Sequence, residues 1–180
     1  MKKFLLLLVL VSMGLSSFAQ KEASTEKNVL KVNTLSLFLG TGSLFFEHGF
    51  SDKISGQLGV GYLNYGSNDN RFSGLFLTPE LKYYPKGNAI DGMYIAPYLR
   101  YQNLTVKVDP DKASLTNMGG GLAFGRQWIT NSGFTMDLFF GGHYTSAKLK
   151  VDESGTENMF NTGAFDGFGV RVGFAIGFGF

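Results

Sequence analysis

The 180-residue sequence contains no cysteine, few prolines and few charged residues. The absence of cysteine excludes disulfide bonds, a thiolate metal site and the lipid anchor of a lipoprotein. Charged residues make up 17% of the chain, against about 25% in an ordinary soluble domain. The net charge of +2 is too small to indicate nucleic-acid binding. After residue 15 there is no run of the ~18 apolar residues that a membrane helix needs.

The first residues have the three parts of a secretory signal peptide. Lys2 and Lys3 supply the charged region, and residues 4–15 supply the apolar core. Ser17 and Ala19 are the small residues that a signal peptidase reads. The sequence therefore predicts a signal peptide over 1–19, a flexible polar leader over 20–28 and one domain over 29–180.

Glycine and aromatic residues are abundant, with 25 glycines, 18 phenylalanines and an aromatic share of 15%. They are distributed over short alternating segments, and residues 168–180 are the clearest of these. Every even position there is large and apolar, and every odd position except Arg171 is glycine or alanine. A period of two is typical of a β-strand with two different faces.

The same period predicts eight strands in all. Short turn signals at 51–53, 85–88 and 130–133 alternate with longer polar stretches at 66–71, 105–116 and 146–166. We interpret 40–43 as a short loop, because bacterial single-chain barrels have an even number of strands. The expected fold is all-β, an eight-stranded antiparallel up-and-down transmembrane β-barrel with strands at 29–39, 43–50, 54–65, 72–84, 93–104, 117–129, 134–145 and 167–180.

Two prolines fall inside the expected strands. Pro79 and Pro97 lie on neighbouring strands, roughly opposite each other. A closed barrel has no edge strand on which a proline is harmless, so we expect an interruption or a bulge in the pairing there.

One face of each strand is apolar, and its aromatic residues gather near the strand ends. A soluble lipocalin-like barrel would place this face inside, but its solvent-facing surface should then be rich in Lys, Glu and Thr. The opposite face is instead rich in glycine and poor in charge, which favours lipid outside. We expect two aromatic girdles where headgroups meet hydrocarbon, formed by Tyr62, Tyr101 and Tyr144 at the outer ends and by Tyr83, Trp128 and Phe180 at the periplasmic ends.

The inward face carries the charged residues of the strands. A buried charge must be paired or it costs several kcal/mol, so these residues are expected to form an internal network that plugs the barrel. A gate or a narrow ion path is the alternative reading. Eight strands leave an interior only just wide enough for side chains. The predicted lumen charge network is Glu47, Glu80, Lys82, Arg100, Asp137 and Arg171.

His143 and Thr145 are the only hint of catalysis, because a base and a hydroxyl two residues apart share one strand face. The pair faintly resembles the His-x-Ser pattern of outer-membrane lipid A deacylases. Thr replaces Ser, both residues face the lumen, and an acid would have to come from Glu153 or Glu157 in the loop. A polar position near the outer rim is the simpler reading, and no catalytic residue is predicted.

Nearly all of the expected domain resembles a family of small Bacteroidota outer-membrane β-barrels known as a domain of unknown function. The resemblance lies in N-V-L-K-V-N-T-L-S-L (28–37), L-F-F-E-H-G-F (44–50), L-T-P-E-L-K-Y-Y (77–84), G-M-Y-I-A-P-Y-L-R-Y (92–101) and G-G-G-L-A-F-G-R-Q-W (119–128). It implies an eight-stranded barrel and transfers no functional residue. Phe180 also resembles the C-terminal signal that the barrel-assembly machinery recognises.

The sequence thus predicts a non-enzymatic protein of the outer membrane, exported through a cleaved signal peptide. Its role is structural, or it binds through outer loops such as 105–116, with Lys107, Asp109, Asp111 and Lys112, and 146–166. The alternatives are a lipid A-modifying hydrolase and a narrow pore. The expected partners are outer-membrane lipid and the barrel-assembly machinery. We expect a monomer without cofactor, metal or nucleic acid, and the sequence specifies no extracellular or operon partner.

Overall fold

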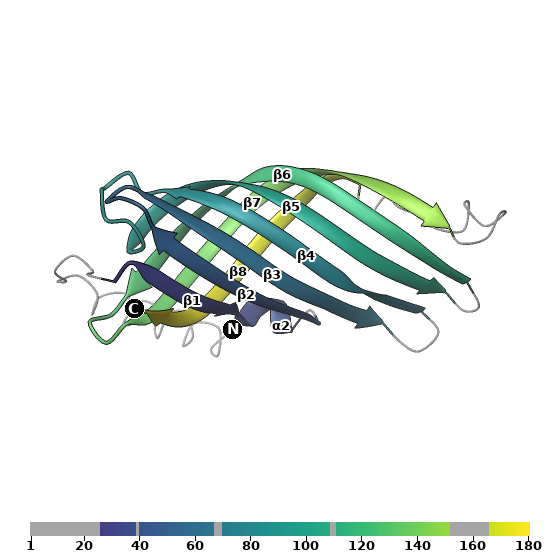
Figure 1. Ribbon diagram of the computed structural model, residues 1–180, viewed down its shortest axis with the longest axis horizontal. Coiled ribbons are helices and arrows are strands. Elements are labelled where there is room, and N and C mark those ends of the chain that lie inside the picture. The colour runs from purple at the N-terminus through teal and green to yellow at the C-terminus, as the bar shows by residue number, and fades with distance from the viewer. Residues whose placement is uncertain (1–25, 39, 67–69, 109–110, 152–165) are drawn as a thin grey trace, which may run out of the picture.

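The computed structural model describes residues 26–38, 40–66, 70–108, 111–151 and 166–180. The predicted signal peptide and most of the predicted leader lie outside these residues, as do Asp109, Glu153 and Glu157. Figure 1 shows long tilted strands wrapped around one axis. The elements in chain order are β1 (Asn28–Asn33), α2 (Thr34–Leu37), β2 (Thr41–Gly49), β3 (Ile54–Gly66), β4 (Asn70–Tyr83), β5 (Gly92–Val108), β6 (Asp111–Ile129), β7 (Phe134–Val151) and β8 (Gly167–Gly179).

The sheet is a closed barrel in which each strand pairs antiparallel with its neighbours in sequence and β8 pairs with β1. The predicted eight-stranded up-and-down fold is therefore confirmed. One end of the barrel carries the turns at 50–53, 84–91 and 130–133, and we call it the turn end. The strands β1 and β8 also meet there, where Asn28 N donates to Phe180 O at 3.0 Å. The opposite end is called the loop end.

Side chains alternate between the two faces as predicted. On β3, Ser55 and Gln57 are buried, whereas Leu58, Val60 and Tyr62 are exposed on the outside. Pairing in register places residues of like face side by side, so the apolar side chains form a continuous outer band.

The predicted strand over 29–39 is wrong beyond residue 33. Asn33 is the N-cap of α2, since its side chain accepts a hydrogen bond from Ser36 N, an arrangement that stabilises the start of a helix. The Ser36 hydroxyl also contacts Thr41 O and Ser43 Oγ. Asn33 thus turns the chain out of the sheet before it returns as β2. No helix among the described residues is long and apolar enough to cross a membrane.

The predicted loop over 105–116 is also wrong, because β5 and β6 continue through it and pair as far as Val108 and Asp111. β7 likewise extends to Val151. Figure 1 shows β5, β6 and β7 projecting at the loop end. The extension has a small apolar interior in which Leu104 and Leu115 are buried. The backbone pairing of β5 with β6 thus continues through a stretch whose composition is typical of a loop.

Pro79 and Pro97 do interrupt the pairing of β4 with β5. Between Leu77↔Tyr101 and Tyr83↔Ile95 the only register pair is Glu80↔Tyr98. The register is the same on both sides of the gap, so the ladder is broken without a bulge. The neighbouring ladders run through both prolines without a gap. The missing N–H donors are thus confined to one seam.

Candidate functional site

Four charged side chains form a square of alternating sign inside the turn half of the barrel. Lys31 Nζ lies 2.6 Å from Glu47 Oε2 and 2.7 Å from Asp137 Oδ2. Lys82 Nζ lies 2.9 Å and 3.0 Å from the same two oxygens. All four side chains are fully buried. The two cations and two anions cancel, so the square carries no net charge into the barrel interior.

The remaining polar atoms of the square have neutral partners. Ser55 Oγ and Tyr84 OH donate to Glu47 Oε1 at 2.6 Å and 2.7 Å. Tyr94 OH donates to Asp137 Oδ1 at 2.7 Å. Lys31 also bonds the Gln127 amide oxygen. Burial raises the pKa of the Tyr84 phenol well above its usual value, and the nearby carboxylates add to this, so Tyr84 remains a neutral donor.

Lys31 is the member of this site that sequence reasoning missed. It stands between Leu30 and Val32, which are both exposed on the outer face. The alternation that placed Glu47 and Asp137 inward therefore also places Lys31 inward. The predicted lumen charge network lacked Lys31 because the faces of the first strand were not assigned.

A second ionic contact lies further toward the loop end. Arg171 Nη2 lies 2.6 Å from Glu80 Oε1, which also accepts from Gln57 Nε2 at 2.9 Å. The Arg171 guanidinium lies over the rings of Tyr98 and Phe139, at 4.6 Å and 4.7 Å from their centroids. Its Nη1 atom is buried and has no hydrogen-bond partner among the described residues.

Arg100 does not take part in the ion pairs described above. Its guanidinium lies over the Phe76 ring at 4.5 Å from the centroid. The Arg100 Nε atom is buried without a hydrogen-bond partner in the part of the chain that the structure describes. The six predicted lumen residues thus divide into three in the square, the Glu80–Arg171 pair and a solitary Arg100.

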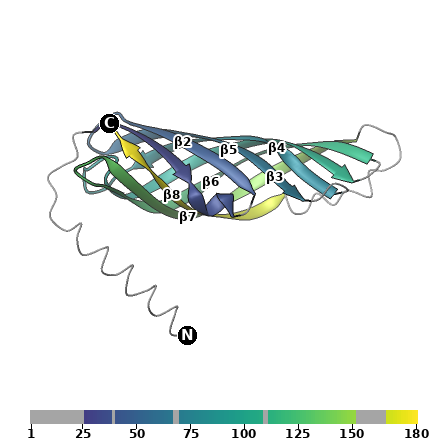
Figure 2. The same cartoon turned by 90° about the horizontal axis from the view of Figure 1, so that it is seen from below.

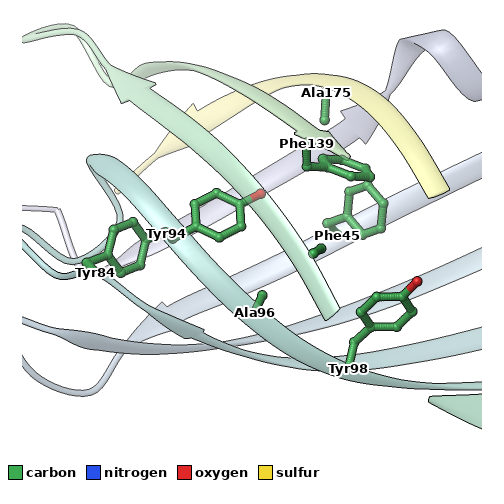
Figure 3. Close-up of a cluster of buried hydrophobic side chains, with 8 residues drawn as sticks. Phe45, Tyr84, Tyr94, Ala96, Tyr98, Phe139 and Ala175 are labelled. Carbon is green, nitrogen blue, oxygen red and sulfur yellow. The ribbon is translucent and has the colours of Figure 1, made fainter. Parts of the chain in front are cut away.

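Aromatic rings fill the space between these charges. Figure 3 shows Phe45 and Phe139 facing each other and Tyr84 lying close to Tyr94. The Phe45 and Phe139 centroids are 6.1 Å apart in an edge-to-face arrangement. The Phe139 ring occupies the space over Gly173, where an added Cβ would lie 2.1 Å from a ring carbon. The bare inner face of β8 therefore makes room for rings from neighbouring strands.

Apolar groups lie at both ends of the interior. Val29, Ile90 and Ile129 are buried together at the turn end, and Leu104 and Leu115 are buried together at the loop end. Ile90 has a φ of 63°, which is unusual for a β-branched residue. Its carbonyl accepts a hydrogen bond from Gln127 Nε2 at 2.8 Å, which ties this turn to the charged square.

His143 and Thr145 do face the interior, near the loop end. The His143 Nδ1 atom lies 3.0 Å from Tyr98 OH, and Thr145 Oγ1 donates to Gly167 O at 3.4 Å. Glu153 and Glu157, the acids considered for this pair, are outside the described residues. Within the described ranges, no group of three or more His, Asp or Glu residues could hold a metal ion.

The expected girdle residues all lie on the outer face or at its ends. Tyr83, Trp128 and Phe180 lie at the turn end, each within one residue of a strand terminus. Tyr62, Tyr101 and Tyr144 do not lie at strand ends, because β3, β5 and β7 continue to Gly66, Val108 and Val151. Seven further residues amount to roughly 20 Å of strand, so β5 and β7 rise well beyond the level of these tyrosines.

Fold and interior together define a small closed β-barrel whose centre is filled by a neutral network of buried charges. The chain belongs to the family described as "Protein of unknown function (DUF3575)", whose profile matches residues 4–162. No curated protein and no solved structure matches the chain.

Proposed function

We propose that this protein is an integral barrel of the outer membrane that neither conducts ions nor catalyses a reaction, and that its projecting loop end binds or supports a partner outside the cell. The observation that carries the proposal is the continuous outer band of apolar side chains. Leu138, Phe140 and Val172, from two neighbouring strands, are 49%, 62% and 55% exposed. Monomeric soluble proteins rarely expose apolar patches of more than a few hundred Å².

The filled interior supports a structural or binding role over a pore. The charged square contains residues from β1, β2, β4 and β7, and apolar clusters lie beyond it at both ends. A conducting path would have to pass through paired charges and dry apolar groups. We therefore expect repeated insertions into a planar bilayer to give no conductance steps, and regular steps would restore the pore hypothesis.

The non-enzymatic proposal is supported by the partners of the candidate pair, since His143 Nδ1 contacts Tyr98 OH and the Thr145 hydroxyl donates to Gly167 O. We expect lipid A from cells with and without the protein to have the same acyl pattern by mass spectrometry. A loss of one acyl chain that depends on His143 would overturn this expectation.

The membrane placement is tested by fractionation and by one pair of variants. The protein should be recovered in the outer-membrane fraction and should migrate differently on a gel with and without boiling. Phe140 lies midway along the outer face between Met136, which pairs with Trp128, and Tyr144. Phe140→Arg should cost about 2–4 kcal/mol in a bilayer, whereas Asn131→Arg in an exposed turn should cost little. Recovery as a soluble protein that tolerates Phe140→Arg would refute the placement.

A further inference from the structure

The wall of the barrel is incomplete on one side of the loop half. β1 pairs with β8 only from Val29↔Gly179 to Asn33↔Ala175, and with β2 only as far as Val32↔Leu44. Beyond Asn33 the chain leaves the sheet as α2. Over residues 167–174, β8 pairs with β7 on one side. The other edge, which faces β1 further along, has no strand beside it among the described residues. Figure 2 shows α2 at the end of β1 with β8 passing close to it.

The helix α2 covers only part of this edge. Thr34 Oγ1 donates to Phe174 O at 3.0 Å. Leu37 and Phe38, by contrast, are exposed, and Phe38 is 87% exposed. Val172 pairs with Phe140 and therefore lies within the apolar band, on the turn side of Tyr144. In hydrocarbon an open sheet edge is tolerated only where it is buried in protein or lines a cavity.

A cavity of about 440 Å³ lies at this gap, within the range of pockets that bind small ligands. Arg171 points inward from β8, whereas Val170 and Val172 point outward, and all three line the cavity. A cavity that contacts all three passes around the edge of β8. It therefore connects the interior with the outer surface, where Leu35 and Phe38 complete its apolar rim.

The inner wall of the cavity has an excess of positive charge. The inward charged residues of the described strands, between the two apolar ends, comprise four cations and three carboxylates. The square uses two of each, so Glu80 is left to balance both Arg100 and Arg171. These two arginines line the cavity, and each has a buried nitrogen without a hydrogen-bond partner among the described residues. Arg171 is buried and Arg100 is half-buried, and a charge removed from water is stabilised by an opposite charge, so this wall is suited to an anion. The cations are Lys31, Lys82, Arg100 and Arg171, and the carboxylates are Glu47, Glu80 and Asp137.

We propose that this cavity binds a fatty acid, with its carboxylate between Arg100 and Arg171 and its acyl chain leaving through the gap between β8 and α2. A guanidinium binds a carboxylate with directed, charge-assisted hydrogen bonds. The chain would lie against Leu35, Phe38, Val170 and Val172, which are the apolar side chains at the rim. The inference rests on the proposed membrane placement, because it assumes that the gap opens into lipid.

The test is native mass spectrometry of the full chain, refolded from denaturant into an uncharged detergent so that it carries no cellular lipid. Palmitate should add once per barrel and saturate. Hexadecanol has the same chain without the charge, and acetate has the charge without the chain, so both should bind at least tenfold more weakly. Equal binding of hexadecanol and palmitate, or several palmitates per barrel without saturation, would overturn the proposal.

The Arg100→Gln variant should bind palmitate about tenfold to a hundredfold more weakly, since a hydrogen bond to a charged group contributes about 1.5–3 kcal/mol. Arg126→Gln is the matched control, because Arg126 lies over Trp128 at the turn end. A second pair changes two exposed phenylalanines. Phe38→Asp at the rim should weaken binding, and Phe50→Asp in a turn should not. Equal affinities within both pairs would contradict the proposed site.

The two proposals fail in different ways. A barrel that inserts into vesicles and shifts on an unboiled gel but binds no palmitate overturns the fatty-acid site alone. A barrel that binds palmitate through Arg100 but is recovered as a soluble protein overturns the membrane placement and leaves the anion-binding cavity standing.

Discussion

Both halves of the barrel interior contain buried cations and carboxylates, but the charges are fully paired only in the turn half. In the turn half, two lysines share two carboxylates and every carboxylate oxygen of the square has a donor. In the loop half, two arginines have one glutamate between them and lie over aromatic rings. In the turn half every strand has a neighbouring strand on both sides, although the β4–β5 ladder is interrupted at Pro79 and Pro97. In the loop half β8 loses its neighbour β1. A network in which every polar atom has a partner stabilises a fold. A network with an excess cation beside an opening is suited to binding a ligand.

The largest expected effect is in the saturated half. Lys31→Met leaves Glu47 and Asp137 with Lys82 alone, and breaking a buried ion pair from one side costs about 3–5 kcal/mol. Urea unfolding in detergent micelles, followed by Trp128 fluorescence, measures the loss. Lys53→Met in an exposed turn is the matched control and should change little. Adding Glu47→Gln to Lys31→Met should recover part of the loss, and a further loss of the same size would argue against the square.

The next effect concerns the packing of the aromatic layer in the loop half. Gly173→Ala places a methyl group against the Phe139 ring, and overpacking of this kind costs about 1–3 kcal/mol. Gly42→Ala is the control, because among the described residues nothing other than the adjacent residues lies within 4 Å of the added carbon. Combining Gly173→Ala with Phe139→Leu should restore stability. If both alanine variants unfold alike, the layer is less tightly packed than described.

A smaller effect is expected where the wall opens. Asn33→Ala removes the cap of α2, and such caps contribute about 1 kcal/mol. Hydrogen exchange of residues 34–37 should become faster, while exchange in β7 stays the same. Asn131→Ala, in an exposed turn, should leave both regions unchanged. Unaltered exchange in α2 would mean that Ser36 and Thr34 hold the helix in place without Asn33.

The smallest effect is expected for Arg100→Gln on the stability of the ligand-free barrel. The variant loses the contact with the Phe76 ring, worth about 0.5–2 kcal/mol, but removes an unpaired charge from the interior. The two contributions oppose each other, so urea unfolding should shift by less than about 1 kcal/mol. A loss as large as that of Lys31→Met would show that the two halves are equally saturated.

The faces of the strands could be predicted from the sequence because a period of two assigns each residue a side without any knowledge of its partners. Glu47, Lys82 and Asp137 were placed inward on this basis, and the turn positions followed from short clusters of polar residues, proline and glycine. Which charges meet could not be predicted in the same way. Lys31 and Asp137 are 106 residues apart, and only the closure of the barrel brings them together.

Strand ends were the least predictable feature, for two opposite reasons. In residues 105–108 and 111–116 the composition resembles that of a loop, yet the pairing of β5 with β6 continues. In residues 34–37 the apolar alternation of Leu35 and Leu37 resembles a strand, yet the Asn33 cap starts a helix. The gap beside β8 exists because residues 34–37 form a helix where a strand was expected. The cavity at this gap therefore could not be predicted from the sequence.

The position of Lys31 on the first strand also has a consequence for the order of assembly. The contact between β1 and β8 joins segments about 150 residues apart, and contacts of such high sequence separation are slow to form. Lys31 contacts Glu47, 16 residues away on the adjacent strand, and Asp137, 106 residues away on β7. The first contact can form when β1 pairs with β2, whereas the second requires β1 to meet β8. We therefore expect Lys31 to favour, at closure, the register of β1 against β8 that brings its ammonium within reach of Asp137.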